Sequence, residues 1–148
     1  MEQVSELTIS YKPKVKAANR YCIRCSLDAY RLLMEQAFDT ETIDYKEYFK
    51  LILLDGANKV LGVTNISEGG MDSTVVDVRL VLQTALLAHS SRIIIAHNHP
   101  AGGLVPSKED DATTQKVMEA AKLLDISLYD HLIVTRDSYY SYADEGRI

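Results

Sequence analysis

Two histidines and an aspartate lie close together in the segment AHNHPAGGLVPSKEDD, which contains His97, His99 and Asp110. The run RIIIA before His97 reads as a buried strand, and side chains two residues apart on a strand point to the same face. The two imidazoles are therefore expected to converge. Ser107 stands where a helix N-cap belongs, with Asp110 three residues later in the first helical turn. The loop between them, which contains proline and glycine, returns the carboxylate towards the histidines.

Three ligands of the types N, N and O leave one tetrahedral position open, which distinguishes a catalytic zinc site from a closed structural one. We expect water to occupy that position. Each part of the pattern alone has a simpler interpretation than a metal site. Ser-x-x-Asp before a helix is commonly only a cap, and a single histidine is equally weak evidence for a metal. Two histidines on one strand face, followed closely by a capped carboxylate, favour Zn²⁺ bound by His97, His99 and Asp110.

The pattern resembles a known family. His97-x-His99-Pro100 followed by Ser107-x-x-Asp110 is similar to the metal-binding motif of the JAMM (JAB/MPN) metalloproteins, and HNHP with the later DHLIV resembles their RadC branch. The resemblance covers roughly residues 46–148. It implies a JAB/MPN fold, with a layout like that of cytidine deaminases, and zinc-dependent hydrolysis of an amide or isopeptide bond.

The resemblance also implies two catalytic residues. A glutamate near the first strand of JAMM domains acts on the water at the metal, and Glu47, just before the run YFKLILLD, matches that position. A surface acid that leads into a strand is the simpler interpretation of Glu47. Ser107 matches the family residue near the open coordination position, where it can help to stabilise an oxyanion, besides capping the helix.

The sequence departs from the RadC pattern at three places. Ala101 replaces the serine of HNHPSG, at a position without a ligand role, and Val78-Arg79 replaces the usual Pro-Arg at the start of the preceding helix. Residues 1–45 lack the glycine hairpins of the helix-hairpin-helix region that larger RadC proteins carry. The association of that family with DNA repair therefore transfers poorly to this chain.

Other functions compete with zinc-dependent hydrolysis. A non-catalytic MPN-type module would keep the fold for binding a partner, and the uncertain assignment of Glu47 leaves that alternative open. A nucleobase deaminase needs His-x-Glu followed by Pro-Cys-x-x-Cys, whereas His99 occupies the glutamate position here. Nuclease or repair activity rests on family naming alone.

The elements expected around the site alternate between strands and helices, which predicts an α/β fold with a mixed sheet flanked by helices. We expect a hairpin over residues 48–67, a helix that starts at Asp77, a central strand at RIIIA and a helix from Ser107 to about Leu124. Strands through ISLYDHLIVT and SYYSYA complete the main domain, residues 46–148. Residues 1–45 read as an extension packed on it, with a short strand around Leu7 and Ile9 and a helix over residues 27–37.

The bulk properties fit one soluble domain. The chain has 148 residues, of which 47% are hydrophobic and 25% charged, and no apolar run approaches the roughly 20 residues of a membrane span. The start of the chain lacks the order of a signal peptide, which predicts a cytoplasmic protein. A net charge of −5 argues against binding to duplex DNA. The resemblance to JAMM proteins implies a protein or peptide substrate as the partner. Cys22 and Cys25 have no second pair for a Cys₄ site and read as ordinary thiols.

Overall fold

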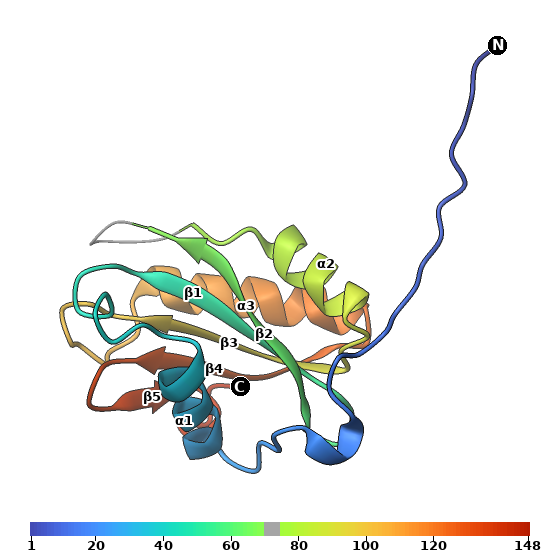
Figure 1. The fold of residues 1–148 in the computed structure, drawn as a ribbon. Coiled ribbons are helices and arrows are strands. Elements are labelled where there is room, and N and C mark those ends of the chain that lie inside the picture. The colour runs from blue at the N-terminus through green and yellow to red at the C-terminus, as the bar shows by residue number, and fades with distance from the viewer. Residues whose placement is uncertain (70–74) are drawn as a thin grey trace.

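A computed structural model describes residues 1–69 and 75–148 and places five strands and three α-helices along the chain (Figure 1). The elements are a short 3₁₀ helix η1 (Ala17–Asn19), α1 (Ser26–Gln36), β1 (Tyr48–Leu54), β2 (Val60–Glu68), α2 (Val78–Leu87), β3 (Arg92–Asn98), α3 (Lys108–Leu123), β4 (Ser127–Val134) and β5 (Tyr139–Ser141). This is the α/β architecture expected from the alternation of strand and helix patterns.

The strands form one mixed sheet in the order β2-β1-β3-β4-β5. Strand β1 is antiparallel to both β2 and β3, β3 is parallel to β4, and β5 returns antiparallel to β4. The run RIIIA lies in β3, the middle strand, where Ile93 to Ala96 are all buried. A mixed sheet flanked by helices, with RIIIA at its centre, is thus confirmed.

Helices cover both faces of the sheet (Figure 1). Successive strand residues point to opposite faces, so Ile93 and Ile95 join one core cluster, with α2 and α3, while Ile94 and Ala96 join another, with α1. His97 lies two residues after Ile95 and so points to the same face of the sheet as Ile93 and Ile95. Its side chain therefore emerges on the face that α3 covers.

The helices that flank β3 begin at caps that the sequence predicts. The Asp77 carboxylate accepts a hydrogen bond from the Arg79 N–H at the start of α2. At the start of α3, Ser107 and Asp110 form a reciprocal capping box. The expected hairpin over residues 48–67 is confirmed as β1 and β2, and the expected last two strands as β4 and β5.

In the N-terminal region one of the two expected elements is present and the other is absent. The helix predicted over residues 27–37 is α1, and its Ala29, Leu32 and Leu33 are buried against the sheet. The short strand predicted around Leu7 and Ile9 is wrong for this structure, because residues 1–13 form no helix or strand and those two side chains are 90% and 83% exposed. An alternating pattern becomes a strand only when it pairs with another strand, and residues 1–13 pair with none of the described strands.

None of the helices in the described residues has the length and apolar character needed to cross a membrane.

Candidate metal centre

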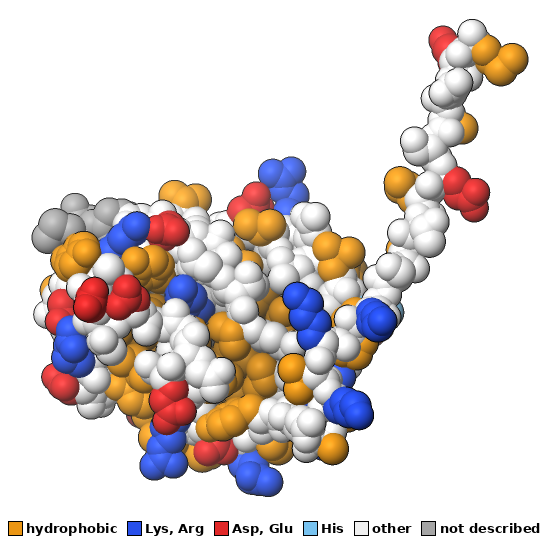
Figure 2. Space-filling model, viewed as in Figure 1, with side chains coloured by type: hydrophobic (Ala, Val, Ile, Leu, Met, Phe, Trp, Pro, Cys, Tyr) orange, Lys and Arg blue, Asp and Glu red, His pale blue; other side chains and the backbone are white. Residues whose placement is uncertain are grey.

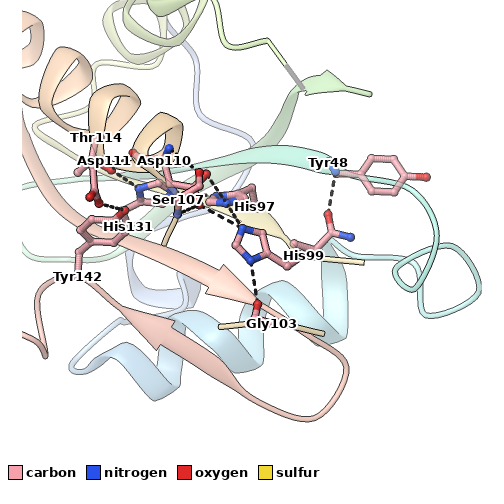
Figure 3. A network of polar contacts seen from close by, with 11 residues as sticks. Tyr48, His97, His99, Gly103, Ser107, Asp110, Asp111, Thr114, His131 and Tyr142 are labelled. Carbon is pink, nitrogen blue, oxygen red and sulfur yellow. Dashed lines mark hydrogen bonds and ion pairs between the residues drawn. The ribbon is translucent and has the colours of Figure 1, made fainter. Parts of the chain in front are cut away.

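The two histidines lie at the carboxyl end of β3. His97 is on the strand, and His99 follows its last residue but continues the pairing, because its N–H donates to the Val134 carbonyl at 3.2 Å. The expected same-face arrangement is observed, with the two Nε2 atoms 3.0 Å apart (Figure 3).

The first turn of α3 brings Asp110 to the same point. Its amide donates to Ser107 Oγ at 3.0 Å, and the Ser107 amide donates to Asp110 Oδ2 at 2.8 Å. These bonds fix the carboxylate, whose Oδ1 lies 3.1 Å from His97 Nε2 and whose Oδ2 lies 3.2 Å from His99 Nε2. Among the described residues, His97, His99 and Asp110 form the one group with the ligand types and spacing to hold a metal ion.

Hydrogen bonds on the far side of each imidazole determine its neutral tautomer. His99 Nδ1 lies 2.8 Å from the Gly103 carbonyl oxygen, which can only accept, so Nδ1 carries the proton. For His97 the contacts form a chain. The Thr114 hydroxyl donates to the Asp110 carbonyl at 2.7 Å, so its oxygen accepts from His131 Nδ1, and His131 Nε2 in turn accepts from His97 Nδ1 at 2.9 Å.

Both Nε2 atoms therefore present lone pairs to each other and to a carboxylate. The two Nε2 atoms lie 3.0 Å apart, and each has a different oxygen of the Asp110 carboxylate within 3.2 Å. Acceptors this close repel unless a cation lies among them. Ligand atoms bound tetrahedrally to one zinc ion at about 2.0–2.1 Å lie about 3.3 Å apart, which is within a few tenths of an ångström of the separations observed. The donor set and its spacing fit zinc.

The pKa values of these groups reflect the same crowding. Burial acts to raise the pKa of the Asp110 carboxyl group, but its contacts with the two imidazoles and the Ser107 N–H outweigh burial and hold that pKa far below its usual value. Contact with Asp110 raises the pKa of His99. The carboxylate is thus charged at neutral pH and attracts a cation, either a proton on His99 or a metal ion.

His131 supports His97 from the centre of the fold. It is fully buried, and burial together with the neighbouring His97 lowers its pKa well below the usual value, which keeps it neutral. Its ring stacks on Tyr142 with centroids 4.7 Å apart and planes at 6° (Figure 3). The adjacent Asp130 does not orient either imidazole, since its side chain binds Ser141 and the amides of His131 and Ala143.

Glu47 shares a pocket with the three ligand candidates. The pocket has a volume of about 620 Å³, and Glu47, Phe49, Ser107 and Glu109 also line it. Glu47 is 9% exposed, and burial raises the pKa of its carboxyl group, although His97 and His99 act to lower it. A surface position for this residue, the simpler interpretation of the sequence, is excluded.

Asn98, between the two histidines, points to the opposite face and fixes the backbone around Glu47. Its side-chain oxygen accepts from the Tyr48 N–H at 2.7 Å, and its amide donates to the carbonyls of Ile43 and Lys46, both at 2.8 Å. The residue is completely buried. One side chain thus binds the peptide groups on both sides of Glu47 and ties them to the strand that carries the histidines.

The structure brings all five sequence-predicted site residues into one pocket: Glu47, His97, His99, Ser107 and Asp110. Ser107 acts as the helix cap. Sequence reasoning missed Asn98 and Thr114 as supporting residues. The signal for Thr114 was its position four residues after Asp110 on one helix face, and for Asn98 it was the strand alternation itself.

Comparison with known proteins identifies the family. The RadC-like JAB domain family matches residues 23–147. The match therefore includes α1 and starts earlier than residues 46–148, the segment in which the sequence motifs were found. A UPF0758 protein of Flavobacterium johnsoniae is 43% identical over 100 residues, 68% of this chain and 44% of that protein. A UPF0758 protein of Porphyromonas gingivalis is 39% identical over 135 residues, 90% of this chain and 58% of its own length.

The chain spans about half the length of these relatives. The family match nevertheless covers most of the chain and contains every residue of the candidate metal centre. The protein belongs to the RadC-like JAB domain family.

Proposed function

We propose that this protein is a zinc-dependent hydrolase of the JAMM type that cleaves a peptide or isopeptide bond. His97, His99 and Asp110 would hold the ion. The observation that carries the proposal is the convergence of two imidazole lone pairs and one carboxylate within 3.2 Å, each fixed by a hydrogen bond on its far side. Ligands fixed in this way bind a metal without first having to be ordered.

A bound zinc ion would polarise the substrate carbonyl and lower the pKa of a coordinated water to about 7. Glu47 would accept the proton of the attacking water at a carboxylate oxygen and pass it to the leaving amine. Its raised pKa and its place in the same pocket suit both steps. The Ser107 hydroxyl accepts the Asp110 N–H, and its own proton remains to donate to an oxyanion.

The side chains around the pocket support a peptide substrate over a nucleic acid. The described residues that line it include the acids Glu47, Glu109 and Asp110 and no lysine or arginine. Phosphate groups need basic side chains for neutralisation, whereas a peptide carries no such requirement.

The metal is tested first. Protein purified without added chelator, analysed by inductively coupled plasma mass spectrometry, should contain about one zinc per chain. The Asp110→Asn variant should lose that zinc, whereas Asp111→Asn, the same change one residue later on the helix, should retain it. Wild-type protein that binds no zinc even after incubation with excess Zn²⁺ would exclude the proposal.

Hydrolysis is tested separately from metal binding. Incubation with a library of peptides and Nε-peptidyl-lysine isopeptides in H₂¹⁸O should give products whose new carboxyl group carries ¹⁸O. Glu47→Gln should retain zinc and lose this activity by at least about a hundredfold. Equal activity of Glu47→Gln and wild type would remove Glu47 as the base. Zinc binding without cleavage of any library member would favour the non-catalytic MPN-type module.

A further inference from the structure

The first turn of α3 carries Asp110 but has little packing against the rest of the fold, and it lies at the surface, where Figure 2 shows charged side chains scattered over the domain. No side chain from residue 108 to residue 113 is buried, and the first buried residue of the helix is Thr114. Apart from the contacts of Asp110 itself, the side-chain hydrogen bonds and ion pairs that tie this turn to other elements, among the described residues, all come from Asp111. The carboxylate of Asp111 binds the segment that follows β5.

Tyr142, the residue after β5, makes the stronger of these contacts. Its side chain is 2% exposed, and its hydroxyl donates to Asp111 Oδ1 at 2.7 Å (Figure 3). Arg147 forms an ion pair with the same oxygen at 2.7 Å, but the two side chains are 39% and 43% exposed, so water screens that pair. A partly buried hydrogen bond to a charged group is worth more than an exposed ion pair. Tyr142 is therefore the main anchor of the first turn of α3.

The same side chain also supports the histidines. The Tyr142 ring lies parallel to the His131 ring, with centroids 4.7 Å apart, and the Tyr142 N–H donates to the His131 carbonyl at 3.0 Å. His131 in turn accepts at Nε2 from His97 Nδ1 at 2.9 Å. Tyr142 thus reaches both parts of the metal centre. It supports the strand histidines through His131 and the helix aspartate through Asp111.

Arg147 restrains the tyrosine in turn. The chain bends back after β5 through Gly146, whose φ of 69° is one that glycine adopts without strain. This bend brings the Arg147 N–H to the Tyr142 carbonyl at 2.8 Å and the Arg147 guanidinium to 4.9 Å from the centre of the Tyr142 ring. A guanidinium is attracted to the face of an aromatic ring. The Tyr142 ring is therefore held by Arg147 as well as by His131.

We propose that Tyr142 is a positioning residue of the metal centre, which sets the separation between Asp110 on α3 and His97 on β3. This inference rests on the metal-binding part of the proposed function and does not depend on hydrolysis. The imidazole lone pairs and the carboxylate repel one another before an ion binds, and the first turn of α3 has no buried side chain to resist that repulsion. An anchored turn keeps the ligand atoms at their observed spacing, so less ordering is needed when the ion binds.

The zinc affinity of the full chain, measured by competition with a chromogenic chelator, tests the proposal. Tyr142→Phe keeps the ring on His131 but removes the hydroxyl, and it should weaken zinc binding by about tenfold, the lower end of the effect of supporting residues. Asp111→Ala removes the acceptor and should weaken binding to a similar extent. Asp111→Asn keeps an acceptor oxygen for the hydroxyl and should change the affinity by less than about threefold. The double variant Tyr142→Phe with Asp111→Ala should lose no more affinity than either single variant, because both remove one interaction.

Tyr139→Phe is the matched control. Tyr139 also stacks on another ring, that of Tyr30, and its hydroxyl also bonds a side chain, at 2.8 Å from Ser26 Oγ, but it lies on the face of the sheet that α1 covers. Loss of its hydroxyl should change zinc affinity by less than about threefold. Circular dichroism checks that each variant is folded.

The outcomes separate this inference from the proposed function. Wild-type protein that binds no zinc would overturn both. Zinc binding by the wild type with an unchanged affinity in Tyr142→Phe would overturn the positioning role alone. Equal losses in Tyr142→Phe and Tyr139→Phe would also overturn it, because the loss would then come from general destabilisation. Equal losses in Asp111→Ala and Asp111→Asn would show that the hydrogen bond from Tyr142 does not position the turn.

Discussion

The Nδ1 atom of His97 lies 2.9 Å from Nε2 of His131, and this buried contact sets the chemical state of a candidate metal ligand. His131 can accept the His97 proton only because its own Nδ1 proton is donated to Thr114, whose hydroxyl donates to the Asp110 carbonyl. The chain of donors thus starts on one ligand candidate and ends on the backbone of another. Any change along it should alter metal binding without touching the ligands themselves.

Thr114→Val should lower zinc affinity by about tenfold. The valine keeps the shape of the side chain but removes the acceptor of the His131 Nδ1 proton, so His131 and His97 lose their fixed tautomers, and supporting contacts of this kind are worth about 10- to 100-fold in affinity. Competition with a chromogenic chelator measures the change. Thr84→Val is the matched control, because Thr84 on α2 makes the same bond to the carbonyl four residues earlier, at 2.7 Å. An unchanged affinity for Thr114→Val would show that the chain does not control the tautomers.

Removal of zinc should destabilise the wild-type protein. A ligand at about 1,000 times its Kd adds about 4 kcal/mol to the free energy of unfolding. The thermal midpoint with excess zinc should therefore fall by several degrees when EDTA replaces the zinc. His99→Ala should show one midpoint in both conditions, because a ligand is missing. A fall of equal size in His99→Ala would mean that zinc stabilises the protein through some other site.

The sequence allowed prediction of those parts of the site that depend on local periodicity. The alternation of side chains along β3 predicted that His97 and His99 lie together, and the helix cap predicted that Asp110 lies beside them. It did not allow prediction of the contact between His97 and His131, because that contact depends on the register between β3 and β4, set by packing across the sheet. The strand expected around Leu7 failed for a related reason. Alternation indicates a preference for a strand, but residues 1–13 pair with none of the described strands.

Asn98→Ala should lower the free energy of unfolding by about 3 kcal/mol or more. The change leaves the buried Ile43 carbonyl and the partly buried Lys46 carbonyl and Tyr48 N–H without their partner, and each such loss of a buried group costs about 1–3 kcal/mol. Urea denaturation, followed by circular dichroism, measures the effect. Gln115→Ala removes an exposed amide on α3 and should change the stability by less than about 0.5 kcal/mol. A loss below 1 kcal/mol for Asn98→Ala would mean that the segment around Glu47 is held by other contacts.

Glu47→Gln should stabilise the metal-free protein at neutral pH. Burial raises the pKa of Glu47 in the folded state, so in that state its carboxylate is less favourable than in the unfolded chain. For an acid whose folded pKa is raised, this penalty is present in full above the folded pKa and fades as the pH falls through it towards the unfolded value.

The difference in unfolding free energy between Glu47→Gln and wild type should therefore shrink from pH 7 to about pH 4, near the ordinary pKa of a glutamate. Urea denaturation in EDTA at each pH measures it, with Glu41→Gln, the same change at an exposed acid, as the control. A difference that grows on acidification would mean that the folded state favours the charged carboxylate. Glu47 would then be held by a cationic partner and would be a poor proton acceptor at neutral pH, because its pKa would be lowered.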